Sequence, residues 1–119
     1  LGNHEFNFGL PSLRKFIADS KFPVLAANVR KVGDGSEAFG SFVIKEVCGV
    51  RVGILGVVAT VPKLVEPAIN IDGLRFDPIL ETVKTYVPKV RAAGVDVVVI
   101  AMHGGPDTVP STGPYQRLA

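Results

Sequence analysis

The first residues of the chain carry the side chains best suited to chemistry. Asn3, His4 and Glu5 place an amide, an imidazole and a carboxylate at consecutive positions directly after Gly2. Gly and Asn favour turns and left-handed backbone, so this cluster predicts a loop and not a helix or strand. The second histidine, His103, follows a strongly apolar run and opens another Gly-rich turn. Imidazole, amide and carboxylate groups serve in acid–base and metal sites, so we expect two polar loops, each beside a structural element.

The hydrophobic pattern around these loops predicts an α/β chain. Apolar residues spaced three and four apart predict helices, and short alternating or continuous apolar runs predict strands. The expected order is a helix at 10–20, a buried strand at 24–27, a surface loop at 31–40, a strand hairpin at 41–47 and 50–58, an irregular connection at 59–77, a helix from 77 to about 94, a strand at 95–102 and turn-rich chain beyond 103. A helix, a glycine turn and an apolar strand lead into a polar loop, the α/β pattern whose ligands lie beyond the strand's carboxyl end. His103 stands at that end.

The second helix has clear local signals. Asp77 is expected to be its N-cap and Pro78 its first residue, and Gly94 its C-terminal cap. Pro88 lies inside it and costs about 3 kcal/mol in an isolated helix. We therefore expect a kink or an early break at Pro88.

Three residues next to or within buried strands have two interpretations each. Asn28 follows the strand expected at 24–27, and it either faces a substrate or satisfies the turn at the strand's end, which we favour. Gly53 and Gly56 form a G-x-x-G spacing inside an apolar strand. Nucleotide-binding turns need a further glycine and a helix start, so close packing of the strand against a neighbour is the better explanation.

Composition excludes several classes. The chain has 119 residues, nearly half of them apolar, which is a globular and not a disordered composition. Its net charge of +2 is too small to predict a nucleic-acid polymer or an anionic membrane as a partner. The single cysteine, Cys48, excludes an internal disulfide framework, and no apolar run reaches the roughly 20 residues of a membrane-spanning helix.

A resemblance to a known family rests on an ordered set of segments. Gly2-Asn3-His4-Glu5 resembles the G-N-H-E signature of the calcineurin-like metallophosphoesterases. The run through Gly9 resembles the branch that contains 5′-nucleotidases and 2′,3′-cyclic-nucleotide phosphodiesterases. Similar segments follow in the family's order at 22–29, 52–56 and 93–99, and the last leads into His103-Gly104, similar to an H-x-G metal loop.

This resemblance implies an α/β fold that is part of a four-layer sandwich (αββα), with mixed sheets flanked by helices. Residues 1–119 are expected to form part of one metallophosphoesterase catalytic domain. The chain opens on Leu1, directly at its polar loop, and we expect an internal fragment. The longer protein is then expected to carry a D-x-H and a G-D motif upstream and a G-H-x-H motif downstream.

The resemblance also implies roles for individual residues around two divalent metal ions, drawn from Mn, Zn, Fe or Co. Asn3 would be an amide-oxygen ligand and His103 an imidazole ligand of the same ion. His4 would stabilise charge on the phosphoryl group and protonate the leaving oxygen. Asn7 stands where many members have Asp, the partner of His4. Either Asn7 replaces that Asp, in which case catalysis by His4 would be weaker or its pH dependence shifted to more acidic pH, or Asn7 only stabilises the turn. Glu5 is expected to brace the loop through backbone hydrogen bonds.

The implied activity of the longer protein is hydrolysis of a nucleotide or other phosphoester, as a 5′-nucleotidase or a cyclic-nucleotide phosphodiesterase. The isolated segment is expected to be inactive, and a C-terminal substrate-binding domain and an exported, periplasmic or cell-surface location are implied. The alternative is a non-catalytic relative that keeps the fold as a binding or structural module, with Asn7 as an early sign of lost chemistry. A P-loop or Rossmann nucleotide binder has no supporting motif here.

Overall fold

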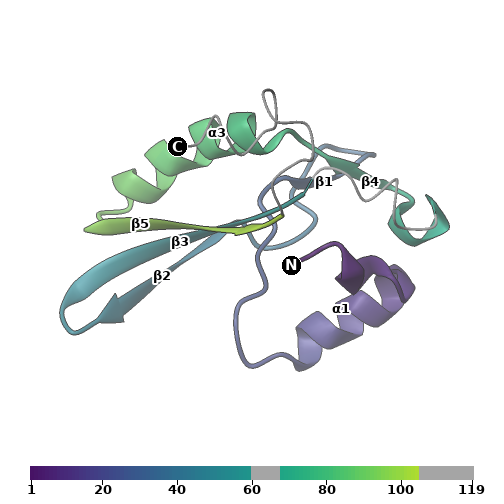
Figure 1. The fold of residues 1–119 in the computed structure, drawn as a ribbon, viewed down its shortest axis with the longest axis horizontal. Helices are drawn as coiled ribbons and strands as arrows, with labels where there is room; N and C mark the ends of the chain where they lie inside the picture. The colour runs from purple at the N-terminus through teal and green to yellow at the C-terminus, as the bar shows by residue number, and fades with distance from the viewer. Residues whose placement is uncertain (60–67, 105–119) are drawn as a thin grey trace.

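The computed structural model describes residues 1–59 and 68–104, arranged as two sheets with helices around them (Figure 1). The expectations for 60–67 and 105–119 lie outside the described residues. The elements in order are η1 (His4–Phe6), α1 (Gly9–Asp19), β1 (Val29–Lys31), β2 (Phe42–Val47), β3 (Val50–Val58), η2 (Ala68–Ile71), β4 (Leu74–Phe76), α3 (Ile79–Ala92) and β5 (Val97–His103). This mixed α/β arrangement confirms the expected fold class.

The larger sheet has the strand order β2-β3-β5. β2 and β3 form the expected antiparallel hairpin. Its two-residue turn is Cys48-Gly49, in which both residues have positive φ, 52° and 79°, as the tight turns favoured in hairpins require. β5 joins the other edge of β3 in parallel. In Figure 1, α3 covers one face of this sheet and α1 lies on the other side.

Helix α3 is held against β3 by a packed apolar face. Ile79, Val83 and Tyr86 form one core cluster with Leu55 and Val57. A Cβ at position 53 would lie 2.3 Å from Val90 Cγ1, and one at position 56 would lie 2.4 Å from Leu25 Cβ. The two glycines of the G-x-x-G spacing therefore serve close packing, as expected.

The early break considered for α3 does not occur, and its expected N-cap was wrong. The helix continues through Pro88 to Ala92. Tyr86 and Val90 on either side of Pro88 are buried, and their packing offsets the backbone hydrogen bond that proline removes. The N-cap is Pro78 and not Asp77. The Asp77 carboxylate is held instead by Arg75, whose Nε lies 2.8 Å from it.

The segment 24–27 was expected to be a strand and is not one. It has a single bridge, between Leu25 and Gly40, and the regular strand in this region is β1, slightly later. β1 pairs antiparallel with β4, which lies in the stretch expected to be irregular. Each of these strands has only three residues, too few for an alternating pattern to stand out from the surrounding sequence.

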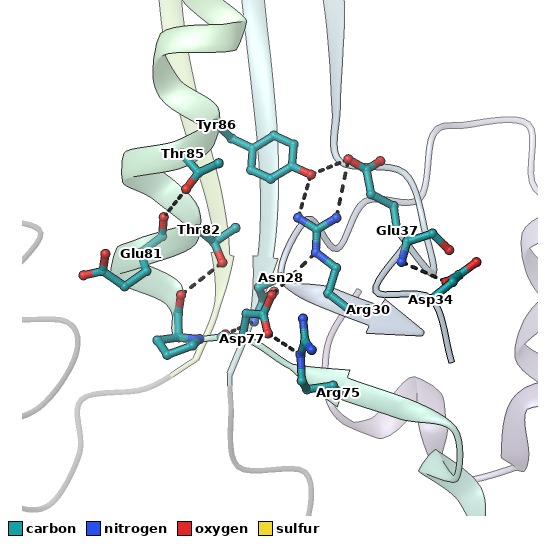
Figure 2. A network of polar contacts seen from close by, with 12 residues as sticks. Asn28, Arg30, Asp34, Glu37, Arg75, Asp77, Glu81, Thr82, Thr85 and Tyr86 are labelled. Atoms are coloured by element: carbon teal, nitrogen blue, oxygen red, sulfur yellow. Dashed lines mark hydrogen bonds and ion pairs between the residues drawn. The ribbon is translucent and has the colours of Figure 1, made fainter. Parts of the chain in front are cut away.

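A polar network ties β1 and the loop after it to α3 (Figure 2). Arg30 donates to the Tyr86 hydroxyl at 2.8 Å, and that hydroxyl donates to the Glu37 carboxylate. Arg30 Nε also lies 3.6 Å from Asp77 Oδ2. These groups join the smaller sheet to the helix that covers the larger one, so the relative position of the two sheets is fixed by polar as well as apolar contacts.

Candidate metal centre

Asn3 and His103 are brought into contact by the fold. Asn3 Oδ1 lies 2.9 Å from His103 Nε2, although the two residues stand 100 positions apart. The amide oxygen can only accept, so without a metal Nε2 is the donor of this contact; to bind an ion, Nε2 must give up that proton. A cavity of about 620 Å³ borders His103 and the opening loop. The cavity is lined by His103, Gly2 and Glu5 but not by Asn3, so the open space lies on the His103 side of the contact.

His103 is placed by the end of the larger sheet. It is the last residue of β5, and in the parallel register it is the partner of Val58, the last residue of β3. Beyond the ladder, the Ala59 N–H donates to the His103 carbonyl at 2.9 Å. Two neighbouring strand ends thus hold its backbone, as the α/β pattern predicted.

Asn3 is placed by a short 3-10 turn and one aromatic anchor. It is the N-cap residue of η1, and the Phe6 N–H donates to the Asn3 carbonyl at 3.2 Å. The Phe6 ring is fully buried and packs edge-on against Phe39 and Phe76, with ring centroids 6.0 and 5.5 Å away. The Glu5 carboxylate accepts the Gly2 N–H, so its expected bracing role is confirmed.

Gly2 has a role at the site that its place in the motif did not reveal. A Cβ at position 2 would lie 2.8 Å from both Cε1 and Nδ1 of His103, and 2.9 Å from Glu5 Oε2. The backbone of Gly2 is thus the surface against which the imidazole rests. The available signal was a glycine directly before a polar cluster, but the sequence does not show which side chain it faces.

His4 and Asn7 both lie exposed at the two ends of the turn that follows Asn3. The Asn7 N–H donates to the His4 carbonyl at 3.1 Å, and the Asn7 carbonyl accepts from Asn70 Nδ2 at 2.8 Å. These contacts secure the backbone of the loop. The catalytic roles of the two side chains stay predictions.

The donor types of the contacting pair fit part of a metal site. An amide oxygen and an imidazole nitrogen are ligands that Zn, Mn, Fe and Co accept. Within residues 1–59 and 68–104, no group of three or more His, Cys, Asp or Glu side chains is close enough to hold an ion. The described residues therefore offer one amide oxygen and one imidazole nitrogen that meet at one point, and an ion held there would need further ligands.

Comparison with known proteins shows which family the chain resembles. No protein-family model matches the chain. It is 34% identical, over an alignment 129 residues long, to a 2′,3′-cyclic-nucleotide 2′-phosphodiesterase/3′-nucleotidase of Salmonella typhimurium. The alignment covers all of this chain and 19% of that protein. The crystal structure of the calcineurin-like phosphoesterase YfkN from Bacillus subtilis superposes with a TM-score of 0.83 at 31% identity, over 96% of this chain and 36% of that one. Over its whole length the chain is thus similar in sequence and fold to calcineurin-like phosphoesterases.

A second structure agrees with the branch suggested by the sequence. The 5′-nucleotidase precursor of Thermus thermophilus superposes with a TM-score of 0.75 at 30% identity, over 87% of this chain and 20% of that one. The resemblance of this phosphoesterase segment to nucleotidases and cyclic-nucleotide phosphodiesterases is thus confirmed. The segment spans about a fifth of the length of the Salmonella relative. None of the helices in the described ranges is long and apolar enough to cross a membrane.

Proposed function

We propose that this chain is part of the catalytic domain of a two-metal phosphoesterase that hydrolyses nucleotides. The observation that supports this most strongly is the 2.9 Å contact between Asn3 Oδ1 and His103 Nε2. Two loops a hundred residues apart bring an amide oxygen and an imidazole together where the strands of an α/β sheet end, the usual place for ligands in such folds. The Salmonella and Thermus proteins named above are nucleotide hydrolases by name.

In this proposal Asn3 and His103 hold the same divalent ion. When bound, the metal pair supplies Lewis acidity to the phosphoryl group and activates water. Gly2 supports the His103 ring, and the buried Phe6 fixes the turn that presents Asn3. His4, the exposed residue directly after Asn3, donates a proton to the leaving oxygen. The remaining ligands come from the longer protein, in the D-x-H, G-D and G-H-x-H motifs expected outside residues 1–119.

The wider setting is part of the same proposal. A C-terminal substrate-binding domain supplies the contacts to the nucleotide, in line with the small share of the relatives that this segment spans. The longer protein is exported or held at the cell surface, as the word precursor in the description of the Thermus protein suggests. The metal is Mn, Zn, Fe or Co, which exchange readily at sites of nitrogen and oxygen ligands.

The test uses the full-length protein and a panel of 5′-nucleotides, 3′-nucleotides and 2′,3′-cyclic nucleotides. Phosphate release is measured after chelation and after return of Mn²⁺ or Zn²⁺. We expect activity that chelation abolishes, that metal restores, and that Asn3→Ala and His103→Ala both lower by at least about 100-fold. Thr85→Ala, an exposed hydroxyl on α3, is the control and should leave activity unchanged.

Absence of metal-dependent hydrolysis across the whole panel would contradict the proposal. It would favour the alternative of a binding or structural module that keeps the fold. Sequencing the coding DNA on both sides gives an independent check, because a non-catalytic relative should lack the flanking Asp and His ligands.

A further inference from the structure

Asn28 is the most completely buried polar side chain among the described residues, with no exposed surface. Its amide makes three hydrogen bonds to backbone. Nδ2 donates to the Val58 carbonyl at 2.8 Å and to the Asp77 carbonyl at 3.2 Å, and Oδ1 accepts the Val58 N–H at 3.0 Å. A buried polar group is normally satisfied, but here the partners are 30 and 49 positions away. The side chain therefore joins distant parts of the fold.

The contact with Val58 replaces a missing strand. The β2–β3 ladder ends at the pair Phe42–Leu55, whereas β3 continues to Val58 beside β5. Past that point, the Ala27 N–H donates to the Gly56 carbonyl at 2.7 Å. Two residues further along β3, the Asn28 amide pairs with both the N–H and the carbonyl of Val58, as a neighbouring strand would. If the Asn28 amide were absent, the buried N–H and carbonyl of Val58 would have no hydrogen-bond partner on the edge of β3 that faces away from β5.

The other side of this strand end carries the candidate metal ligand. Val58 is the register partner of His103, and the next residue, Ala59, donates its N–H to the His103 carbonyl. Asn28 thus acts on the backbone that fixes His103, without touching His103 itself. Asn28 and Asp77 lie together at the start of α3 in Figure 2, and the Asp77 N–H donates to the Asn28 carbonyl at 2.8 Å. This second link ties Asn28 to the start of α3 as well as to β3.

We infer that Asn28 is a positioning residue for His103, which holds the carboxyl end of β3 so that the neighbouring end of β5 presents the imidazole to Asn3. This inference rests on the proposed function for its consequence, since a displaced imidazole would be a weaker metal ligand. Residues that orient a ligand from behind typically change metal affinity or activity by about 10- to 100-fold when mutated.

The test compares full-length Asn28→Ala and Asn28→Ser with wild type. Asn28→Ser loses the amide but keeps a hydroxyl and introduces no charge into this buried position, so it provides a milder variant if Asn28→Ala is too unstable. Tyr86→Phe is the matched control. Tyr86 is also buried, and Tyr86→Phe loses two hydrogen bonds, to Arg30 and Glu37, neither of which lies on β3 or β5.

Three quantities are measured: thermal unfolding, Mn²⁺ and Zn²⁺ binding by calorimetry, and amide hydrogen exchange at Ala59 in the metal-free protein. The Asn28 variants should weaken binding of one metal ion by about tenfold or more and speed exchange at Ala59. Tyr86→Phe should lower the unfolding temperature and leave both other readouts within about twofold of wild type.

Asn28 variants that behave like Tyr86→Phe, with lower stability but unchanged metal affinity and unchanged exchange at Ala59, would overturn the inference. Wild-type protein that binds no metal would overturn the proposed function instead. In that case exchange at Ala59 still decides the positioning role, because it reports the contact with the His103 backbone without any metal.

Discussion

The amide oxygen of Asn3 lies 2.9 Å from Nε2 of His103, and nothing local in the chain brings them together. Asn3 belongs to a short turn anchored by the Phe6 ring, which packs in an apolar cluster with Leu13 and Ile71. His103 ends a strand in the larger sheet. The contact therefore forms only when both parts of the fold are in place, which is the arrangement of a site and not of a local turn.

Gly2→Ala is expected to damage the site without unfolding the protein. The added Cβ would meet the far end of the His103 ring at 2.8 Å, and a ring at the end of a side chain can turn away. Metal affinity should fall by about tenfold or more, while the unfolding temperature stays close to wild type. Gly33→Ala is the matched control, because a Cβ there meets nothing within 4 Å. Equal metal affinity in the two variants would show that Gly2 does not support the imidazole.

His4→Gln is expected to separate catalysis from metal binding. If His4 protonates the leaving oxygen, kcat for nucleotide hydrolysis should fall by about 10² to 10⁴. Metal content should stay at the wild-type level, because His4 is not proposed as a ligand. Loss of a metal ion from His4→Gln would contradict this assignment, and so would an unchanged kcat.

Glu37 is expected to contribute to stability in a pH-dependent way. Burial acts to raise the pKa of its carboxyl, but hydrogen bonding, including that from the Tyr86 hydroxyl, and the Arg30 guanidinium outweigh it and hold the pKa below its usual value of 4.5. A carboxyl with a lowered folded pKa stabilises the fold above its unfolded pKa, and this contribution is lost as the pH falls through the folded pKa. Thermal unfolding followed from pH 6 down to about pH 3 should show a smaller loss of stability for Glu37→Gln than for wild type. Unfolding temperatures that fall equally with pH in wild type and Glu37→Gln would contradict a pH-dependent contribution from Glu37.

The isolated 119 residues are expected to be inactive. The two candidate ligands, Asn3 and His103, are too few to hold a pair of ions, because structural and catalytic sites normally need at least three protein ligands for each ion. Nucleotide hydrolysis by the purified segment, in excess Mn²⁺ or Zn²⁺, should be no faster than the metal-only blank. A metal-dependent rate above the blank would require a complete site within this chain.

The sequence allowed the elements next to the two polar clusters to be predicted, because their signals are local. The clusters themselves were expected to be loops, whereas His4–Phe6 form a 3-10 helix and His103 is the last residue of β5. A continuous apolar run predicts β5, and the polar residue that follows it falls at the strand's end, where ligands collect. Asn3 was identified through its motif. The helices were also predictable, to within a few residues, from apolar spacing and glycine turns.

The remaining features depend on partners distant in sequence. β1 and β4 are three residues each and exist because they pair with one another. Asp77 had a good position for a helix cap, but Arg75 and Arg30 hold its carboxylate instead. Asn28 was expected to satisfy a local turn, whereas its amide pairs with Val58, 30 positions away. No pattern in a single sequence indicates such pairings.

Metal stoichiometry in variants of the full-length protein tests the central claim most directly. Wild type, Asn3→Ala, His103→Ala and the double variant are loaded with Mn²⁺ or Zn²⁺, freed of excess metal by gel filtration and analysed for bound metal. If Asn3 and His103 hold the same ion of a pair, each single variant loses one equivalent and the double variant loses no more than that. A double variant that loses both equivalents, or single variants that keep both, would contradict the account.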